Sequence, residues 1–159
     1  MIQATTEIAF EAFISTEDNR IDTSVGTGKL QYLFKITNDM DGAIHYVYPA
    51  IGDIYPRYTW FVFAYSATPD MYLTQVKLIP SGHYKYEVYE VSWIGTPTLT
   101  VTTAPATETT VLPVSDANGV VQGLVTKGIL NVTDKAGTEQ VQYTQREAPA
   151  STNYIYYGQ

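Results

Sequence analysis

The 159-residue sequence contains no cysteine, which excludes disulfide bonds, thiolate metal ligands and cysteine nucleophiles at once. It also contains no apolar run of about 18 residues and no basic stretch followed by an apolar one. We therefore expect neither a membrane-spanning helix nor a secretory signal.

Charged residues are few, and basic residues are the fewest. Charged residues make up 16% of the chain, with 9 Lys and Arg against 16 Asp and Glu, and the formal net charge is −7. The basic residues are scattered and form no run, whereas a surface that binds nucleic acid needs clustered Lys and Arg. We therefore expect no nucleic-acid partner.

What the sequence has instead is Thr, Ser, Gln and 14 Tyr, a composition that favours strands and suits contact surfaces. Its length and its apolar content of 45% are sufficient for one domain with a real hydrophobic core.

The clearest strand covers residues 83–93, and its alternation changes phase part-way along. Its apolar side chains first occupy even positions and then odd ones: Tyr84, Tyr86 and Val88, then Tyr89, Val91 and Trp93. A regular strand cannot bury both sets on one face unless an extra residue is inserted near Val88 and Tyr89. We predict such a β-bulge or a sharp twist there; the alternative is a strand whose two halves are buried on opposite faces.

Alternation and turn residues predict about ten short strands in all. The two segments 15–28 and 49–56 are rich in turn residues and are expected to be loops. Residues 71–79 and 83–93 are expected to pair as a hairpin, because only Pro80, Ser81 and Gly82 separate them. The expected strands are 5–14, 29–37, 44–48, 57–65, 71–79, 83–93, 109–114, 120–125, 128–133, 138–144 and 153–159.

This pattern predicts an all-β fold, an antiparallel β-sandwich of jelly-roll or immunoglobulin-like type. We assign residues 1–94 to the sandwich core and the Thr- and Pro-rich residues 95–108 to a linker or an extended arm. Residues 109–159 are expected to form hairpins, at 116–119 and 134–137, that pack on the same sandwich or on a neighbouring subunit.

Known ligand motifs are matched only in part. Gly26-Thr27-Gly28-Lys29 lacks the earlier Gly and the following Ser or Thr of a phosphate loop, and a strand rather than a helix follows it. Asp39-x-Asp41-Gly42 lacks the bidentate acid of an EF-hand, although a looser calcium site that adds Asp53 stays open. We therefore assign no cofactor and no metal site.

No catalytic motif is evident either. His45 and His83 both occupy polar positions of strands, and no metal-ligand spacing links them. Glu87 and Glu90 would share a face only if the bulge at 88–89 exists. A hydrolase that uses one of them together with His83 remains a hypothesis, but no catalytic residue is assigned and we expect the chain not to be an enzyme.

The surplus of aromatic residues is the most informative feature. Rings at positions 55, 58, 60, 65 and 72 could form a carbohydrate-binding platform or a subunit interface, and the scarcity of charge favours the interface. The terminal segment 153–159 could close its own sheet or add to a neighbour's. The predicted interface residues are Tyr55, Tyr58, Trp60, Tyr154, Tyr156 and Tyr157.

Several stretches together resemble small virion proteins of tailed bacteriophages. They are Thr-Glu-Asp-Asn-Arg at 16–20, Tyr-Lys-Tyr-Glu-Val-Tyr-Glu-Val at 84–91, Val-Leu-Pro-Val at 111–114, Gly-Leu-Val-Thr-Lys-Gly at 123–128, Tyr-Thr-Gln at 143–145 and Asn-Tyr-Ile-Tyr-Tyr-Gly-Gln at 153–159. The resemblance spans most of the chain but carries no catalytic residue.

The resemblance implies a capsid decoration or auxiliary protein, or a neck, tail or fibre subunit. Its partners would be other copies of itself, for example in a trimer, and virion proteins such as the major capsid protein, with no membrane. It would be made in the host cytoplasm and located in the virion. The alternative is a carbohydrate- or receptor-binding module of a phage tail or head fibre.

Overall fold

Alternating side chains give nine strands and no α-helix within residues 1–135, the part of the chain that the computed structural model describes. The expected all-β fold is confirmed. Three single 3-10 turns also occur: η1 (Glu17–Asn19), η2 (Thr27–Lys29) and η3 (Met71–Leu73). The strands are β1 (Ile2–Thr5), β2 (Phe10–Ile14), β3 (Leu30–Asn38), β4 (Ile44–Val47), β5 (Ala50–Ile54), β6 (Thr59–Tyr65), β7 (Gln75–Val76), β8 (Gly82–Ser92) and β9 (Val120–Thr133).

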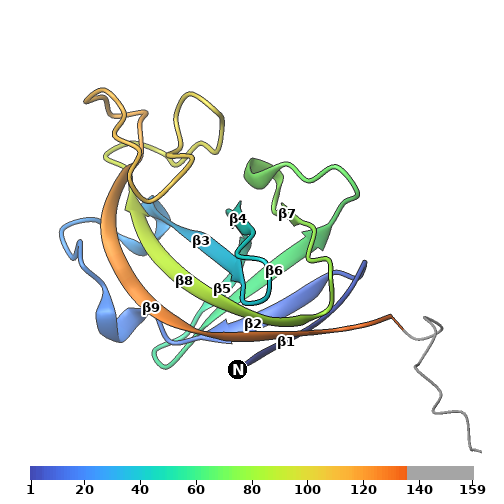
Figure 1. Ribbon diagram of the computed structural model, residues 1–159. Coiled ribbons are helices and arrows are strands. Elements are labelled where there is room, and N and C mark those ends of the chain that lie inside the picture. Colours follow the sequence, from blue (N-terminus) through green and yellow to red (C-terminus); the bar gives the residue numbers. More distant parts are fainter. Residues whose placement is uncertain (136–159) are drawn as a thin grey trace, which may run out of the picture.

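The strands form two sheets (Figure 1). The five-stranded sheet has the order β1-β9-β8-β3-β4, and the smaller sheet has the order β2-β6-β5, with the short β7 added beside β6. Most neighbours are antiparallel, but β1 pairs with β9 in parallel, and so does β7 with β6. Figure 1 shows β8 and β9 as long curved strands that run side by side.

The main core combines buried side chains from both sheets. At its centre, Phe34 of β3 packs edge-on against Phe61 and Phe63 of β6, with ring centroids 5.1 Å apart in both pairs. All three side chains are fully buried. Because burial of one large apolar side chain contributes roughly 1.5–3 kcal/mol, this aromatic contact is a main source of the attraction between the sheets.

A second cluster lies on the opposite face of the five-stranded sheet, under residues 95–119. It contains Leu33 of β3, Val91 of β8 and Trp93, which directly follows β8, together with Tyr48 and Ala104. The Tyr48 hydroxyl donates to the carbonyl of Pro105 at 2.6 Å, and Gly119 donates its N–H to the carbonyl of Thr103 at 2.8 Å. Residues 95–108, predicted to be a linker or an extended arm, therefore fold back over the sheet together with residues 109–119.

The phase change in β8 corresponds to burial on two faces. Tyr84, Tyr86 and Val88 point into the main core, whereas Tyr89, Val91 and Trp93 face the second cluster. The pairing of β8 with β3 is regular through 88–89, so β8 itself contains no bulge. The register does shift between Val88 and Tyr89 on the other side, but the additional residue, Val125, belongs to β9. The predicted bulge in β8 is therefore wrong, and the two-faced alternative is correct.

Three other predictions need correction. The expected strand 5–14 is broken into β1 and β2, with Glu7 at a φ of 59° between them. The expected loop 49–56 contains strand β5. The expected strand 71–79 consists of η3 and the two-residue β7, and it pairs with β6 rather than with 83–93.

Between residues 109 and 135, the last part of the chain that the structure describes, there is one strand, β9. Residues 109–114 form no strand, so the hairpin at 116–119 is absent, and 120–125 and 128–133 belong to the single strand β9. β9 lies between β1 and β8, so it is part of the same sheet as the N-terminal strand β1. The expected strands 138–144 and 153–159 lie outside the described residues.

Candidate functional site: an exposed aromatic patch on the smaller sheet

Four aromatic side chains gather on the outer face of the smaller sheet, and we call Phe13, Tyr55, Tyr58 and Trp60 the aromatic patch. The ring of Phe13 lies 6.3 Å from that of Trp60 with the planes nearly parallel, at 10°. Phe13 also meets Tyr58 edge-on at 5.7 Å, and Tyr55 lies 4.8 Å from Tyr58. Phe13, Tyr55 and Tyr58 are 61%, 42% and 38% exposed, which is unusual for clustered large rings.

Strand alternation explains why these rings point outward. Ala12 and Ile14 of β2 are buried in the main core, so Phe13 between them faces the other way. Likewise, Phe61 of β6 is buried and its neighbour Trp60 faces outward, directly opposite Phe13 in the β2–β6 pairing. The two rings are therefore cross-strand neighbours on one face.

The position of the Trp60 ring depends on a glycine. The β5–β6 register shifts between Ile51 and Asp53, which leaves Gly52 as an additional residue. A Cβ atom at Gly52 would lie 2.4 Å from Cε3 of Trp60, so a larger residue would displace the indole. Glycine thus allows the indole ring to lie against the β5 backbone.

Carboxylates flank the aromatic patch. Asp53 pairs directly with Trp60 across β5 and β6, and Glu11 lies two residues before Phe13 on the same face of β2. Both residues are exposed. The negative charge of Asp53, followed by slight desolvation, raises the pKa of the Tyr55 hydroxyl, which lies 3.5 Å from the carboxylate.

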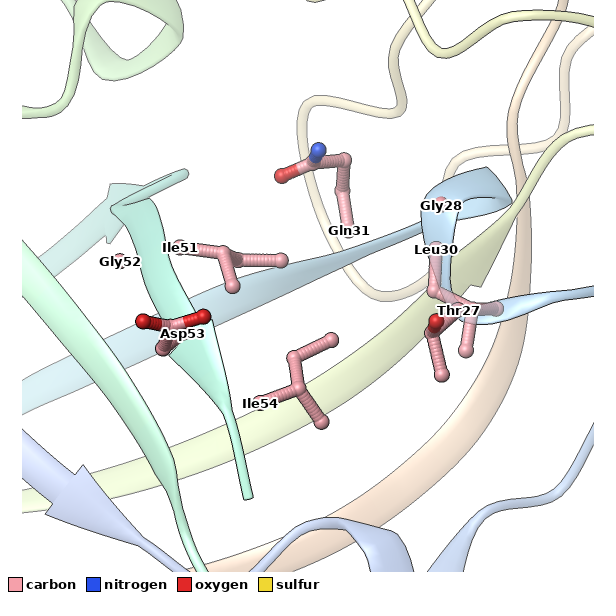
Figure 2. Close-up of a pocket in the computed structure, with 8 residues that line it drawn as sticks. All are labelled: Thr27, Gly28, Leu30, Gln31, Ile51, Gly52, Asp53 and Ile54. Carbon is pink, nitrogen blue, oxygen red and sulfur yellow. The ribbon is translucent and has the colours of Figure 1, made fainter.

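A groove adjoins the other side of β5 (Figure 2). Its volume is about 420 Å³, and among the described residues that line it Asp53 is the charged one. Figure 2 shows Ile51 and Ile54 extending from β5 toward the side where Thr27 and Leu30 lie. The lining residues are Thr27, Gly28, Leu30, Gln31, Ile51, Gly52, Asp53 and Ile54.

The structure gathers only part of the predicted aromatic platform. Tyr55, Tyr58 and Trp60 lie together, whereas Tyr72 stacks on Tyr48 at 6.1 Å beside the second cluster. Tyr65 has the strand phase of Phe61 and Phe63 and so belongs to the core-facing side of β6. Of the predicted interface residues, Tyr154, Tyr156 and Tyr157 lie outside the described residues.

Sequence reasoning did not include Phe13 in the patch. The signal was present, because Phe13 occupies the outward phase of a strand whose other phase is apolar. An outward Phe in an alternating strand marks a contact surface, but its pairing with Trp60 cannot be read from the chain.

The two glutamates of the catalytic hypothesis face opposite sides of β8. Glu87 lies on the outer face of the larger sheet, the face that also carries the second cluster, and its carboxylate is 3.6 Å from Nζ of Lys35. Glu90 is fully buried on the other face and accepts the backbone N–H groups of Ile21 and Asp22 at 3.1 and 2.8 Å. They do not share a face as a bulge in β8 would have required.

Neither histidine joins a polar site with Glu90. His83 is exposed on the outer face of β8, the face of Glu87. His45 lies on β4, where burial lowers its pKa.

Ligand sites suggested by sequence motifs are likewise not assembled. Asp39 pairs with Lys85 at 2.6 Å, and Asp41 accepts the backbone N–H of Ala43 at 2.9 Å. Asp53 lies on the other sheet, in β5. Among residues 1–135 there is no group of three or more His, Asp or Glu side chains that could hold a metal ion.

A second depression, of about 650 Å³, lies on the outer face of the larger sheet. It is lined by Lys35, Lys85 and Lys127 and by the exposed side chains Ile44 and Ile129. Two of these lysines are already in ion pairs, Lys35 with Glu108 and Lys85 with Asp39, both at 2.6 Å. This depression is therefore less able to attract an anion than its three lysines suggest.

Comparison with models of known families, with curated proteins and with solved structures gives no match to this chain. Within the described residues, no helix is long and apolar enough to cross a membrane.

Proposed function

We propose that the chain is a non-enzymatic structural subunit of a tailed-bacteriophage particle, of the capsid-decoration type, that is held in place by its aromatic patch. The observation that carries this proposal is the clustering of four large aromatic rings on the outer face of the smaller sheet. Interfaces are enriched in Tyr and Trp, because their rings supply a large contact area at low cost in conformational entropy.

The size of the patch suits a contact with a protein surface. Burial of one large side chain contributes roughly 1.5–3 kcal/mol, so four partly exposed rings offer enough for a hot spot at the centre of an interface. The placement of this protein in a phage particle rests on the resemblance of the sequence stretches described above. Its neighbours would be other copies of itself or the major capsid protein.

The test combines location with a patch variant. Mass spectrometry and cryo-electron microscopy of purified particles should find the wild-type chain and, for Trp60→Ser, at least about tenfold less of it, as expected when about 1.4 kcal/mol or more of binding is lost. Val111→Ser is the control, because Val111 is 92% exposed and lies in the 95–119 segment, outside the patch. Far-ultraviolet circular dichroism should show that both variants fold.

Absence of the wild-type chain from particles would contradict the proposed location. Equal incorporation of Trp60→Ser and Val111→Ser would contradict the role of the patch.

A carbohydrate-binding module is the second candidate function. The observation in its favour is that the Phe13 and Trp60 rings lie side by side on an exposed surface with nearly parallel planes, at 10°, since aromatic faces pack against sugar C–H groups. Binding of an oligosaccharide that Trp60→Ser abolishes would support this candidate over the first.

A further inference from the structure

The aromatic patch is surrounded by hydrogen-bond acceptors. The carboxylates of Asp53 and Glu11 can only accept, and the indole nitrogen of Trp60 is buried without a hydrogen-bond partner within the described residues. The hydroxyls of Tyr55 and Tyr58 are the patch's own remaining polar groups. A sugar needs both donors and acceptors around its hydroxyls, whereas the strands beside the patch offer carboxylate acceptors, and its accessible donors are the two tyrosine hydroxyls and Arg57 of the β5–β6 turn.

Charge is also separated between the two sheets. No Lys or Arg occurs in β2, β5, β6 or β7, whose acidic residues are Glu11 and Asp53. The lysines that belong to strands lie instead in the larger sheet, in β3, β8 and β9. The strands of the smaller sheet therefore carry a net negative charge. The nearest basic residue along this part of the chain is Arg57, in the β5–β6 turn.

Two attractions for a cation coincide beside Trp60. An aromatic face attracts a cation through its quadrupole, and Asp53 is the cross-strand neighbour of Trp60. A guanidinium group fits this pair best, because it stacks on a ring while its five N–H donors meet a carboxylate in the same plane.

We infer that the aromatic patch binds an arginine side chain presented by a partner protein, with the guanidinium stacked on Trp60 and hydrogen-bonded to Asp53. This inference rests on the proposed function, since it names the chemistry of the partner at the same surface. Phe13 and Tyr58 then contact the apolar stem of the arginine and the residues beside it.

The test uses the full chain and a short Gly/Ser peptide that contains two arginines. A peptide of the same sequence with citrulline in place of arginine keeps the shape and removes the charge. Binding is followed by the indole N–H signals of the two tryptophans in NMR spectra. Trp93 is 1% exposed and serves as the internal control, whereas Trp60 reports on the patch. The arginine peptide should shift the Trp60 signal alone and bind about tenfold more tightly than the citrulline peptide.

Two variants separate local recognition from overall charge. Asp53→Asn and Asp116→Asn each remove one negative charge from an exposed side chain, and Asp116 lies in the 95–119 segment instead of the patch. Asp53→Asn should weaken binding of the arginine peptide about fivefold, and Asp116→Asn should leave it within about twofold of wild type. Arg57→Gln should not weaken it.

Equal affinity for the two peptides, or equal effects of the two Asp variants, would overturn the inference. A Trp60 shift caused by maltohexaose and not by the arginine peptide would instead identify a glycan site and also overturn it. The proposed function fails separately, by the particle experiment above, because a patch can hold a subunit in a particle without recognising arginine.

Discussion

Glu90 shows how a single residue ties a long loop to the sheet. Its side chain is fully buried, and both carboxylate oxygens accept backbone N–H groups from residues 21 and 22 of the segment between β2 and β3. A buried charge of this kind persists only when hydrogen bonds compensate for its lost hydration. The phase of the strand brings Glu90 into the interior, and the loop supplies the donors.

We expect Glu90→Gln to destabilise the fold by about 2 kcal/mol, because hydrogen bonds to a charged group contribute about 1.5–3 kcal/mol and the new amide NH₂ faces a donor. The measurement is the free energy of unfolding in urea at neutral pH. Glu87→Gln is the control, since Glu87 lies on the same strand with a partly exposed carboxylate, and it should change the free energy by less than about 1 kcal/mol. Equal losses in the two variants would contradict the role assigned to Glu90.

At the scale of the element, residues 95–119 are held on the larger sheet by Glu108. Its carboxylate accepts a hydrogen bond from Nζ of Lys35 at 2.6 Å and another from the hydroxyl of Tyr46. The hydrogen bond from Lys35 to Glu108 raises the pKa of Lys35. Partial burial opposes ionisation of Glu108, but the bonds from Lys35 and Tyr46 outweigh it and lower the pKa of Glu108. Burial and the bond to Glu108 raise the pKa of Tyr46 to about 12.

These shifts predict a pH dependence. A carboxyl with a lowered folded pKa stabilises the fold above its ordinary pKa of 4.5, and the contribution is lost as the pH falls through the lowered value. Lys35 and Tyr46 have raised pKa values, so their contributions are fully present below their ordinary pKa values of 10.5 and 10.0 and are lost only at higher pH. The attachment of this segment should therefore be strongest between about pH 5 and pH 10.

We expect Glu108→Gln to lower the free energy of unfolding by about 1–2 kcal/mol at neutral pH, and by progressively less toward about pH 3, where the wild-type carboxyl becomes protonated as well. Urea denaturation of both proteins across this range measures the difference. A difference that stays constant down to about pH 3 would show that the Glu108 charge does not hold the segment.

At the scale of the whole molecule, β3 and β8 serve both hydrophobic clusters. Phe34 and Val88 belong to the main core, while their neighbours Leu33 and Tyr89 contact the second cluster. Loss of either cluster removes packing from the same two central strands. The two clusters should therefore unfold as one cooperative unit.

The variant Trp60→Phe isolates the second cluster spectroscopically, because it leaves the buried Trp93 as the sole tryptophan. We expect the unfolding curves from Trp93 fluorescence and from far-ultraviolet circular dichroism to coincide in urea. A Trp93 transition at clearly lower urea concentration would show that residues 95–119 detach before the sheets separate.

Local patterns were enough to predict the all-β class and the strands β3, β4, β6 and β8, because period-two alternation is a property of the chain itself. The surplus of aromatic residues and the scarcity of charge suggested an interface at Tyr55, Tyr58 and Trp60; the structure places the three side chains together, and the interface itself stays a prediction. Local patterns failed for β5 and for residues 71–79, because strand formation there depends on the neighbour available for pairing. In β5 the bulge residue Gly52 also interrupts the alternation.

Only the tertiary structure decided between a bulge and two buried faces in β8. The even side chains from Tyr84 to Val88 lie in the main core, whereas the odd ones from Tyr89 to Trp93 lie in the second cluster, and no local pattern specifies these distant partners. For the same reason, only the pairing of β2 and β5 with β6 placed Phe13 and Asp53 on either side of Trp60. Where the alternation is unbroken, as in β3, the sequence by itself determined which side chains share a face, and long-range pairing determined what each face meets.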